Sequence, residues 1–172
     1  MSYLMCDLHH LYCTELHNKI VITDKNYLYY RRDTMQITRQ ADYAVRAVLH
    51  LAKMEPNQRA ATSQVAKEQH IPPSFLAKII SQLSIAGLLH TSRGARGGVT
   101  LAREPEKITL LEVIEAIDGP IMLNECVGEN STCTFDDDCP LRPVWCEAQE
   151  ELVARLKNTN FQQLLEQSLT TA

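Results

Sequence analysis

A double proline between two short apolar patterns constrains the fold of this chain more than any other feature. Pro72-Pro73 follows the turn His70-Ile71 and opens a helix, because proline is tolerated in the first helical turn. Gly87 suits the left-handed position just past the end of that helix. Before the turn, Thr62 or Ser63 can cap a shorter helix. The predicted apolar stripe of the second helix consists of Phe75, Leu76, Ile79, Ile80, Leu83 and Ala86.

A ribbon with a glycine-rich tip follows these two helices. Residues 88–92 and 99–101 predict two paired strands, and the tip between them reads Arg93-Gly94-Ala95-Arg96-Gly97-Gly98. Two helices, a tight turn and such a ribbon make a winged helix-turn-helix, whose second helix fits the major groove of DNA. Glycines let a backbone approach a phosphate, and arginines can enter a minor groove. The predicted DNA-contacting residues are Thr38, Arg39, Ser74, Phe75, Lys78, Arg93, Arg96 and Gly97.

Helical periodicity predicts most of the remaining structure, so the expected fold class is mainly α. A further helix precedes the two helices of the helix-turn-helix and ends at Pro56-Asn57. Thr109 and Glu112 form a capping box for a fourth helix. A longer helix over residues 143–157 and a last short helix carrying Phe161 complete the pattern. The first helix buries one face, formed by Ala44, Ala47, Val48 and Leu51.

Charge is distributed unevenly along a chain whose net charge is −4. Residues 1–34 are neutral, residues 35–105 carry +5, and residues 106–172 carry −9. The basic block can face a polyanion such as DNA, and the alternative is an unevenly charged solvated surface. A winged helix used for protein contacts, with its two wing arginines merely solvated, is the alternative to DNA binding.

No run of 18 apolar residues and no signal-peptide pattern occurs, so we expect a cytoplasmic protein without a membrane partner. Residues 1–34 show no helical or strand period. They are expected to be a poorly ordered N-terminal extension or the product of a mis-assigned translation start. The predicted domains are this extension, a DNA-binding domain over 35–106, and a cluster-binding loop with dimerisation helices over 107–172.

Four cysteines of the acidic part have the spacing C-x6-C-x5-C-x6-C, at Cys126, Cys133, Cys139 and Cys146. Zinc ribbons and fingers usually pair their ligands as C-x2-C or C-x4-C, and no such pair occurs here. Widely spaced cysteines in an irregular loop suit an iron–sulfur cluster, whose irons need thiolates from several sides. A structural zinc ion and free thiols that act as a redox sensor remain the alternatives.

From Met35 onward the chain resembles the family of winged-helix iron–sulfur transcriptional regulators that includes the iron–sulfur-cluster regulator IscR and the nitric-oxide-sensing repressor NsrR. The resemblance rests on residues 35–47, on the wing over 93–102, and on three cysteines before a long helix with Trp145. It implies a homodimer that binds a double-stranded DNA operator. It also implies a 2Fe–2S or 4Fe–4S cluster held by a variable fourth ligand and by Cys126, Cys133 and Cys139.

The resemblance favours Asp42 of the partner subunit as the fourth ligand, because the nitric-oxide sensors have an acidic residue near the start of their first helix. Cys146 is the alternative ligand, and a residue favoured by the helix dipole is the alternative role of Asp42. Arg142 stands where the IscR branch has histidine. The long helix crosses its partner in this family, and the predicted seam contains Trp145, Ala148, Leu152, Val153 and Leu156.

We therefore expect a transcriptional regulator, in the role of a repressor and not an enzyme, whose operator affinity depends on an iron–sulfur cluster. The cluster would sense nitric oxide, redox state or iron–sulfur supply. The alternative is a cluster-free or zinc-bound winged-helix regulator that responds through cysteine oxidation or a small ligand. An iron–sulfur electron-transfer protein or enzyme has little support, since no glycine motif for a cofactor and no nucleophile–base pair occurs.

Overall fold

The protein is described here by a computed structural model that covers residues 20–22, 28–30, 37–55, 58–92, 94, 97–128, 133 and 138–170. The chain divides into two compact units, Met1–Gln36 and Ile37–Ala172. In the first unit, β1 (Ile20–Ile22) pairs with β2 (Leu28–Tyr30) in antiparallel register. These two short strands have no counterpart in the sequence pattern, which shows no strand period over residues 1–34. Both strands consist of aliphatic and aromatic residues, which favour strands but are too few to show a period.

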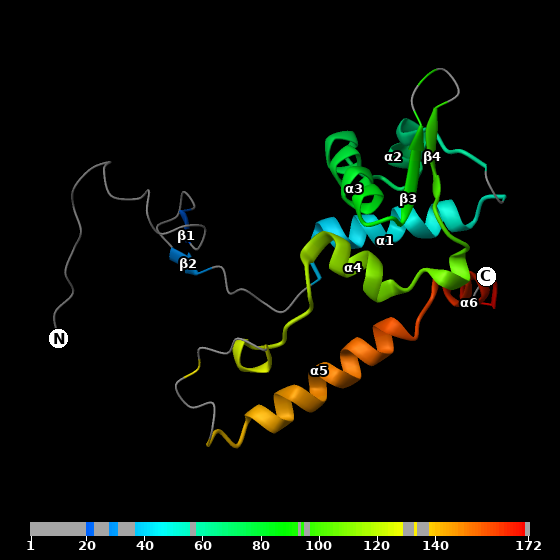
Figure 1. The fold of residues 1–172 in the computed structure, drawn as a ribbon. Helices are drawn as coiled ribbons and strands as arrows, with labels where there is room; N and C mark the ends of the chain where they lie inside the picture. The colour runs from blue at the N-terminus through cyan, green and yellow to red at the C-terminus, as the bar shows by residue number, and fades with distance from the viewer. Residues whose placement is uncertain are drawn as a thin grey trace. The chain divides into compact units, whose positions relative to one another are not determined.

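The second unit is a winged helix-turn-helix with further helices packed around it, which confirms the predicted fold class (Figure 1). No helix in the described ranges is long and apolar enough to cross a membrane. The elements are α1 (Arg39–Ala52), α2 (Thr62–Glu68), α3 (Pro73–Ile85), β3 (Leu89–Ser92), β4 (Gly98–Leu101), the short 3-10 helix η1 (Pro105–Lys107), α4 (Leu110–Asp118), a second 3-10 helix η2 (Glu125–Val127), α5 (Arg142–Lys157) and α6 (Phe161–Thr170).

Helix α1 lies at the centre of this unit and packs against α3, α4 and α6. Thr38 is its N-cap, and the Thr38 hydroxyl accepts a hydrogen bond from the Ala41 N–H at 3.1 Å. The helix ends at Ala52, and the predicted stop at Pro56-Asn57 lies outside the described residues. Its buried face consists of small and aliphatic side chains, which let neighbouring helices approach closely: Ala41, Ala44, Ala47, Val48, Leu51 and Ala52.

The two helices after α1 are joined by the predicted turn. Pro72 is the N-cap of α3, and His70 adopts a positive φ of 53° that reverses the chain. The predicted caps of α2 were wrong, because Ala61 is the N-cap and Thr62 is already the first helical residue. Past the end of α3, Gly87 has a φ of 71°, as predicted.

Strand β4 of the wing is joined to the connection between α1 and α2. Strands β3 and β4 pair in antiparallel register from Leu89 and Leu101 to Ser92 and Gly98. Ala60 and Val99 exchange two backbone hydrogen bonds, at 3.0 and 2.9 Å. Gly98 is required at this contact, since a Cβ there would lie 2.6 Å from the Ala60 carbonyl oxygen.

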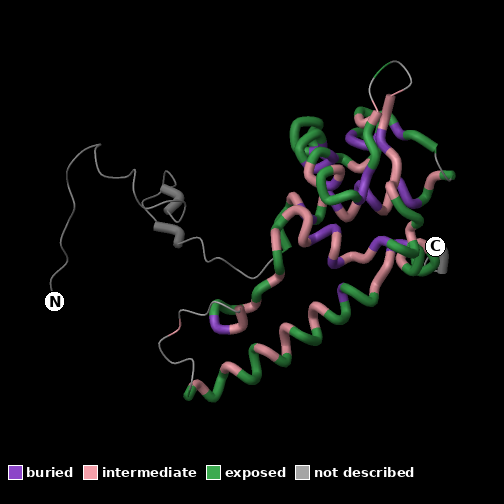
Figure 2. Tube along the Cα trace, in the orientation of Figure 1, coloured by how far each residue is buried: buried purple, intermediate pink, exposed green. Residues whose placement is uncertain are grey.

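Helix α5 forms an arm that extends from the winged helix-turn-helix head. Helix α4 precedes this arm in the chain, and α6 follows it. Thr109 and Glu112 form the predicted capping box of α4. Helix α5 is about 24 Å long and runs away from the head (Figure 1). Buried residues concentrate in the head, whereas α5 is mostly exposed or half-buried (Figure 2). Helix α6 returns to the head, where Phe161 is completely buried in the same core as α1 and α3.

Part of the predicted dimer seam on α5 also packs within the chain. Leu156 is buried within the chain against Leu111 and Ile114 of α4, and Leu152 and Val153 pack on the same small core. The end of α5 that faces α4 is therefore already covered inside one chain. The exposed large apolar residues at and near the start of α5 are Leu141, Val144 and Trp145.

Candidate nucleic-acid interface and cysteine loop

Helix α3 presents three of the predicted DNA-contacting residues on one exposed face. Ser74, Phe75 and Lys78 are all exposed, and 51% of the Phe75 surface is accessible. The opposite face is buried through Leu76, Ile79, Ile80 and Leu83. Phe75 and Ala86 therefore do not belong to the apolar stripe, which corrects the sequence prediction for these two positions.

Phe75 is held by an aromatic ring of α1. The Tyr43 and Phe75 rings meet edge to face, with their centroids 6.4 Å apart and their planes at 83°. The Arg46 guanidinium lies over the Tyr43 ring, 5.6 Å from its centre. The exposed Phe75 side chain is thus supported by Tyr43, and Arg46 lies in turn against the Tyr43 ring.

Further polar contacts tie α1 to both helices of the helix-turn-helix. The Arg46 guanidinium donates a hydrogen bond to the backbone carbonyl of Gln69 in the turn. The Gln69 side-chain amide lies 3.2 Å from His50 Nδ1, and His50 Nε2 lies 3.5 Å from a Glu68 carboxylate oxygen. Gln40 donates to Gln82 of α3 at 2.5 Å.

Sequence reasoning missed this network around the turn. Its signal was the spacing of Asp42, Arg46 and His50 at i, i+4 and i+8, which places three polar side chains along one line of α1. Arg46 also lies 3.7 Å from Asp42, at the spacing of a helical ion pair. The line is therefore a set of contacts with the turn and not only a solvated edge.

Thr38 and Arg39, the two DNA contacts predicted at the start of α1, have different surroundings. The Thr38 hydroxyl donates to Asp118 Oδ1 at 2.6 Å, and the Thr38 N–H donates to Asp118 Oδ2 at 3.1 Å. Arg39 is exposed. Thr38 is consequently engaged in a contact between α1 and α4, whereas Arg39 points its charge into solvent.

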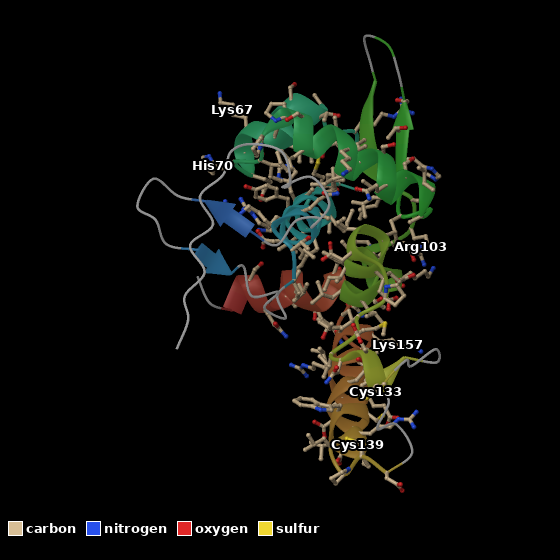
Figure 3. The ribbon with its side chains drawn as sticks, turned by 90° about the vertical axis from the view of Figure 1, so that its left-hand side faces the viewer. Lys67, His70, Arg103, Cys133, Cys139 and Lys157 are labelled. Atoms are coloured by element: carbon tan, nitrogen blue, oxygen red, sulfur yellow. The ribbon has the colours of Figure 1, made fainter. Side chains whose placement is uncertain are left out.

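The wing tip is described only in part. Arg93 and Arg96 lie outside the described residues, while the Gly97 N–H donates to the Gly94 carbonyl at 2.8 Å. Lys67 and His70, which the prediction did not include, are exposed beside the helix-turn-helix turn (Figure 3). Lys67 adds a cationic group near the reading helix.

The start of the cysteine loop is anchored to α5 by Gln149. Its amide oxygen accepts the Leu123 N–H at 2.8 Å, and its amide nitrogen donates to the Ile121 carbonyl at 2.9 Å. Asn124 then caps η2 by accepting the Glu125 N–H at 2.8 Å. These contacts place Cys126, which is only 7% exposed, on a fixed turn beside α5.

The other cysteines lie towards the start of α5. Cys133 and Cys139 are half-buried near that end of the helix (Figure 3), and the Cys139 carbonyl accepts the Arg142 N–H at 3.2 Å. Cys146 is half-buried in the second turn of α5. Asp42, on α1, faces Arg46. Within the described ranges no three His, Cys, Asp or Glu side chains lie close enough together to hold a metal ion.

The thiols of the cysteine loop nevertheless suit an iron–sulfur cluster. Three thiols occur within residues 126–139, and thiolate is the usual protein ligand of iron–sulfur clusters. The loop that carries them is fixed at its first turn by Gln149 and at its end by the start of α5. A carboxylate ligand such as Asp42 would have to be supplied by another element or by a second copy of the chain.

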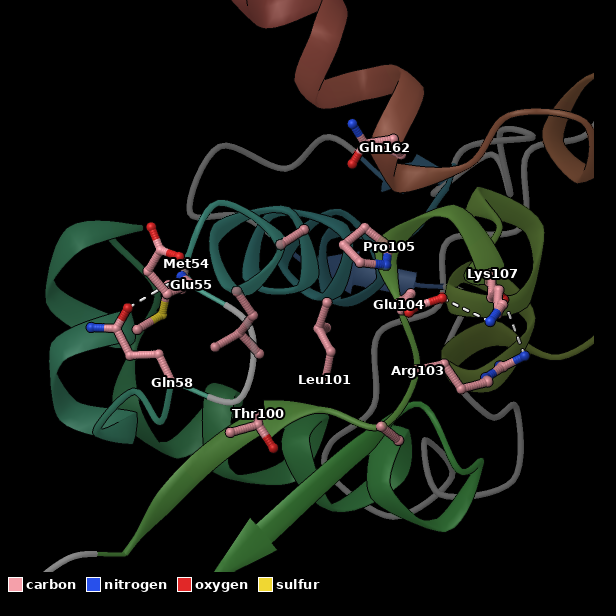
Figure 4. A pocket seen from close by; sticks show the side chains of 13 residues that line it. Met54, Glu55, Gln58, Thr100, Leu101, Arg103, Glu104, Pro105, Lys107 and Gln162 are labelled. Carbon is pink, nitrogen blue, oxygen red and sulfur yellow. Dashed lines mark hydrogen bonds and ion pairs between the residues drawn. The ribbon is translucent and has the colours of Figure 1, made fainter.

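A cavity of about 650 Å³ lies on the head between the end of α1, β4, η1 and α6 (Figure 4). Lys107 pairs with Glu104 at 2.7 Å. The hydrogen bond and the charge of Lys107 lower the pKa of Glu104, and the same pairing raises the pKa of Lys107. Arg103 is paired with Glu112 at 2.9 Å. Since the cations of the lining are matched by carboxylates, the cavity does not indicate an anionic ligand.

Comparisons with known proteins identify relatives of the second unit. A family profile described as "Rrf2: Iron-dependent Transcriptional regulator" matches residues 37–167. The HTH-type transcriptional regulator NsrR of Shouchella clausii is 36% identical over 115 residues, which are 66% of this chain and 77% of that protein. NsrR of Halalkalibacterium halodurans is 32% identical over 132 residues, 76% of this chain and 90% of that protein. Among solved structures, CymR (YrzC), the global cysteine regulator of B. subtilis, matches with a TM-score of 0.65 and 25% identity, over 75% of this chain and 95% of that one.

Proposed function

Because the chain belongs to the Rrf2 family of transcriptional regulators, we propose that it represses transcription and that an iron–sulfur cluster controls its affinity for operator DNA. As a transcriptional regulator, it is not an enzyme. The single observation that best supports the operator-binding role is the exposed face of α3, with Ser74, Phe75 and Lys78 on a helix that contains no acidic residue. A helix of this kind fits the major groove of DNA.

The cluster ligands in this proposal are Cys126, Cys133, Cys139 and the carboxylate of Asp42 from a second copy. Their donor chemistry and the anchoring of the loop by Gln149 support it. When bound, the cluster would supply irons that nitric oxide or an oxidant can attack. A carboxylate oxygen is a harder ligand than thiolate, so the iron that it holds would be easier to attack. The signals in this proposal are nitric oxide, redox state or iron–sulfur supply.

Asp42 occupies a position from which it can influence the reading helix. It shares α1 with Arg46 and Tyr43, and these two residues contact the turn at Gln69 and the ring of Phe75. Withdrawing the Asp42 carboxylate from Arg46 would free the guanidinium to change its contacts with the Gln69 carbonyl and with Tyr43. A change at Asp42 would thereby alter the support of α3.

A second copy of the chain is the proposed partner of α5. Leu141, Val144 and Trp145 form an exposed apolar surface at and near its first two turns, and Val144 is 56% exposed. Burying such a surface against its own copy would place two winged heads on one DNA. Two reading helices about 34 Å apart match successive major grooves on one side of the duplex.

The experiment that tests this function is purification of the full chain without oxygen, followed by its visible spectrum and its iron, sulfide and zinc content. The proposal predicts a coloured protein with iron and sulfide. It also predicts that nitric oxide or air bleaches the spectrum and changes the affinity for a DNA duplex selected from a randomised pool by the same preparation.

Two other outcomes are informative. A colourless protein that retains one zinc ion per chain would contradict the cluster. A metal-free protein whose DNA affinity changes with thiol oxidation would support a cluster-free regulator, and the structural similarity to CymR, described as a global cysteine regulator, favours this second candidate. Failure to enrich any duplex in every state would contradict operator binding itself.

A further inference from the structure

The exposed face of α3 contains few groups that can form hydrogen bonds with bases. Its exposed residues after the two prolines are Ser74, Phe75, Ala77, Lys78, Ser81, Ile85. The helix contains no Arg, Asn, Asp or Glu, so the usual side-chain partners of guanine and adenine are limited to Lys78, which can contact guanine, and one glutamine. That residue, Gln82, is half-buried, and its carbonyl oxygen already accepts from Gln40 at 2.5 Å.

The apolar part of this face is built to project from the head. Phe75 lies in the first turn of the helix, the part that reaches base edges in a helix-turn-helix. More than half of its surface is exposed, although an aromatic side chain usually gains by burial. Its ring is supported edge to face by Tyr43, and Tyr43 in turn lies under Arg46. Ala77, two residues after Phe75 in the same helix, adds an exposed methyl group.

Thymine carries the one apolar group that B-DNA displays in its major groove, the C5 methyl. Phenylalanine and alanine recognise that methyl by apolar contact, and they cannot recognise guanine or adenine by hydrogen bonds. We propose that Phe75, positioned by Tyr43 and assisted by Ala77, reads thymine methyl groups and is the main determinant of operator sequence in this chain. Lys78 and Ser74 then contribute affinity through phosphates or less selective base contacts.

This inference rests on the proposed operator binding, and the test separates the two. The full chain, purified without oxygen, selects duplexes from a randomised pool, and the selected duplex is then resynthesised with deoxyuridine in place of one thymine at a time. Deoxyuridine lacks only the C5 methyl, so Watson–Crick pairing is kept. At the thymines that Phe75 contacts, we expect binding to weaken about fourfold for each methyl removed, the value of one buried methyl-sized group.

The decisive measurement is the effect of the same deoxyuridine substitution on variants. At the thymines that Phe75 contacts, Phe75→Ala should bind the thymine and deoxyuridine duplexes equally, and Phe75→Leu should keep part of the difference. Lys78→Ala is the matched control, since it should weaken both duplexes and keep the full fourfold difference. Tyr43→Leu should reduce the difference while the helical circular dichroism remains, because Tyr43 positions the Phe75 ring and does not itself touch the base.

Each outcome decides between the two proposals. Selection of a defined duplex with no deoxyuridine effect at any thymine would overturn the role of Phe75 and leave operator binding intact. An equal deoxyuridine effect in wild type and Phe75→Ala would assign methyl recognition to another residue. Failure of the wild-type chain to enrich any duplex would overturn the proposed operator binding as well.

Discussion

Thr38 and Asp118 are joined by two hydrogen bonds across a separation of 80 residues in the sequence. One carboxylate oxygen accepts the Thr38 hydroxyl at 2.6 Å, and the other accepts its backbone N–H at 3.1 Å. Thr38 is the N-cap of α1, and Asp118 is the last residue of α4. The pair therefore joins the start of α1, the helix that supports α3, to the end of α4, from which the chain continues towards the cysteine loop.

Thr38→Val should destabilise the head, because it removes the N-cap oxygen and the bond to Asp118 while keeping the side-chain shape. We expect a loss of about 1–2 kcal/mol in the free energy of unfolding, measured by urea denaturation. Arg39→Ala is the control, with a change within about 0.5 kcal/mol. If Thr38→Val lowered DNA affinity and left stability unchanged, Thr38 would act as a DNA contact, as the sequence predicts.

Arg96→Ala should weaken operator binding through electrostatics. Removing one phosphate contact reduces the dependence of log affinity on log salt by about one unit. The measurement is a titration of the selected duplex at several salt concentrations. Arg155→Ala, on α5, should leave the slope unchanged. Equal slopes for wild type and Arg96→Ala would exclude the wing from the DNA contact.

Asp42→Ala and Cys146→Ala should separate the two candidates for the fourth ligand. After reconstitution with iron and sulfide under argon, we expect Asp42→Ala to change the visible spectrum and the rate of reaction with nitric oxide. Cys146→Ala should leave both close to wild type, since a half-buried cysteine on a helix commonly serves as a small apolar residue. The reverse result would indicate four thiolate ligands and would weaken the nitric-oxide role.

Val144→Asp and Leu152→Asp should act on different properties of α5. Val144 is 56% exposed, so its replacement should give monomers in sedimentation experiments with little change in unfolding. Leu152 packs on the small core formed with α4, so an aspartate there should cost about 3 kcal/mol of stability. Glu150→Gln, on the same exposed helix, is the control for both. A dimer that survives Val144→Asp would place the interface elsewhere.

The Glu112 carboxylate should make the stability of the head depend on pH. Burial raises the pKa of Glu112, but hydrogen bonds from the Thr109 N–H, Arg103 and the Thr109 hydroxyl outweigh it and hold the pKa below 4.5. A lowered folded pKa stabilises the protein above pH 4.5, and this contribution disappears as the pH falls through the folded value. In urea titrations from pH 3 to 7, wild type should therefore exceed Glu112→Gln at neutral pH, and the gap should close at the acid end.

Local signals in the sequence predicted the elements of the head well. The proline pair started α3, Gly87 ended it, and Thr109 with Glu112 capped α4, because each of these effects acts within one helical turn. The similarity to known regulators of the Rrf2 family confirms the predicted family. These predictions needed no knowledge of which elements pack together.

The contacts that sequence reasoning missed depend on distant partners. Leu152 was assigned to a dimer seam because it is apolar, and only the position of α4 shows that it packs within the chain. Phe75 was assigned to a buried stripe because it follows the helical period, and only the packing of α3 shows that its ring is exposed and meets Tyr43 of α1. The hydrogen bonds of Thr38 likewise depend on Asp118, far away in the sequence.

The burial of Phe161 limits how the molecule can be divided. Its ring belongs to the core around α1 and α3, although α6 follows the exposed arm α5 in the chain. A fragment that stops after the wing would leave a gap the size of a phenyl ring where this side chain inserts. Anyone wishing to graft the head onto another sensor would have to supply α6 on a separate linker, because the module is continuous in space and interrupted in sequence.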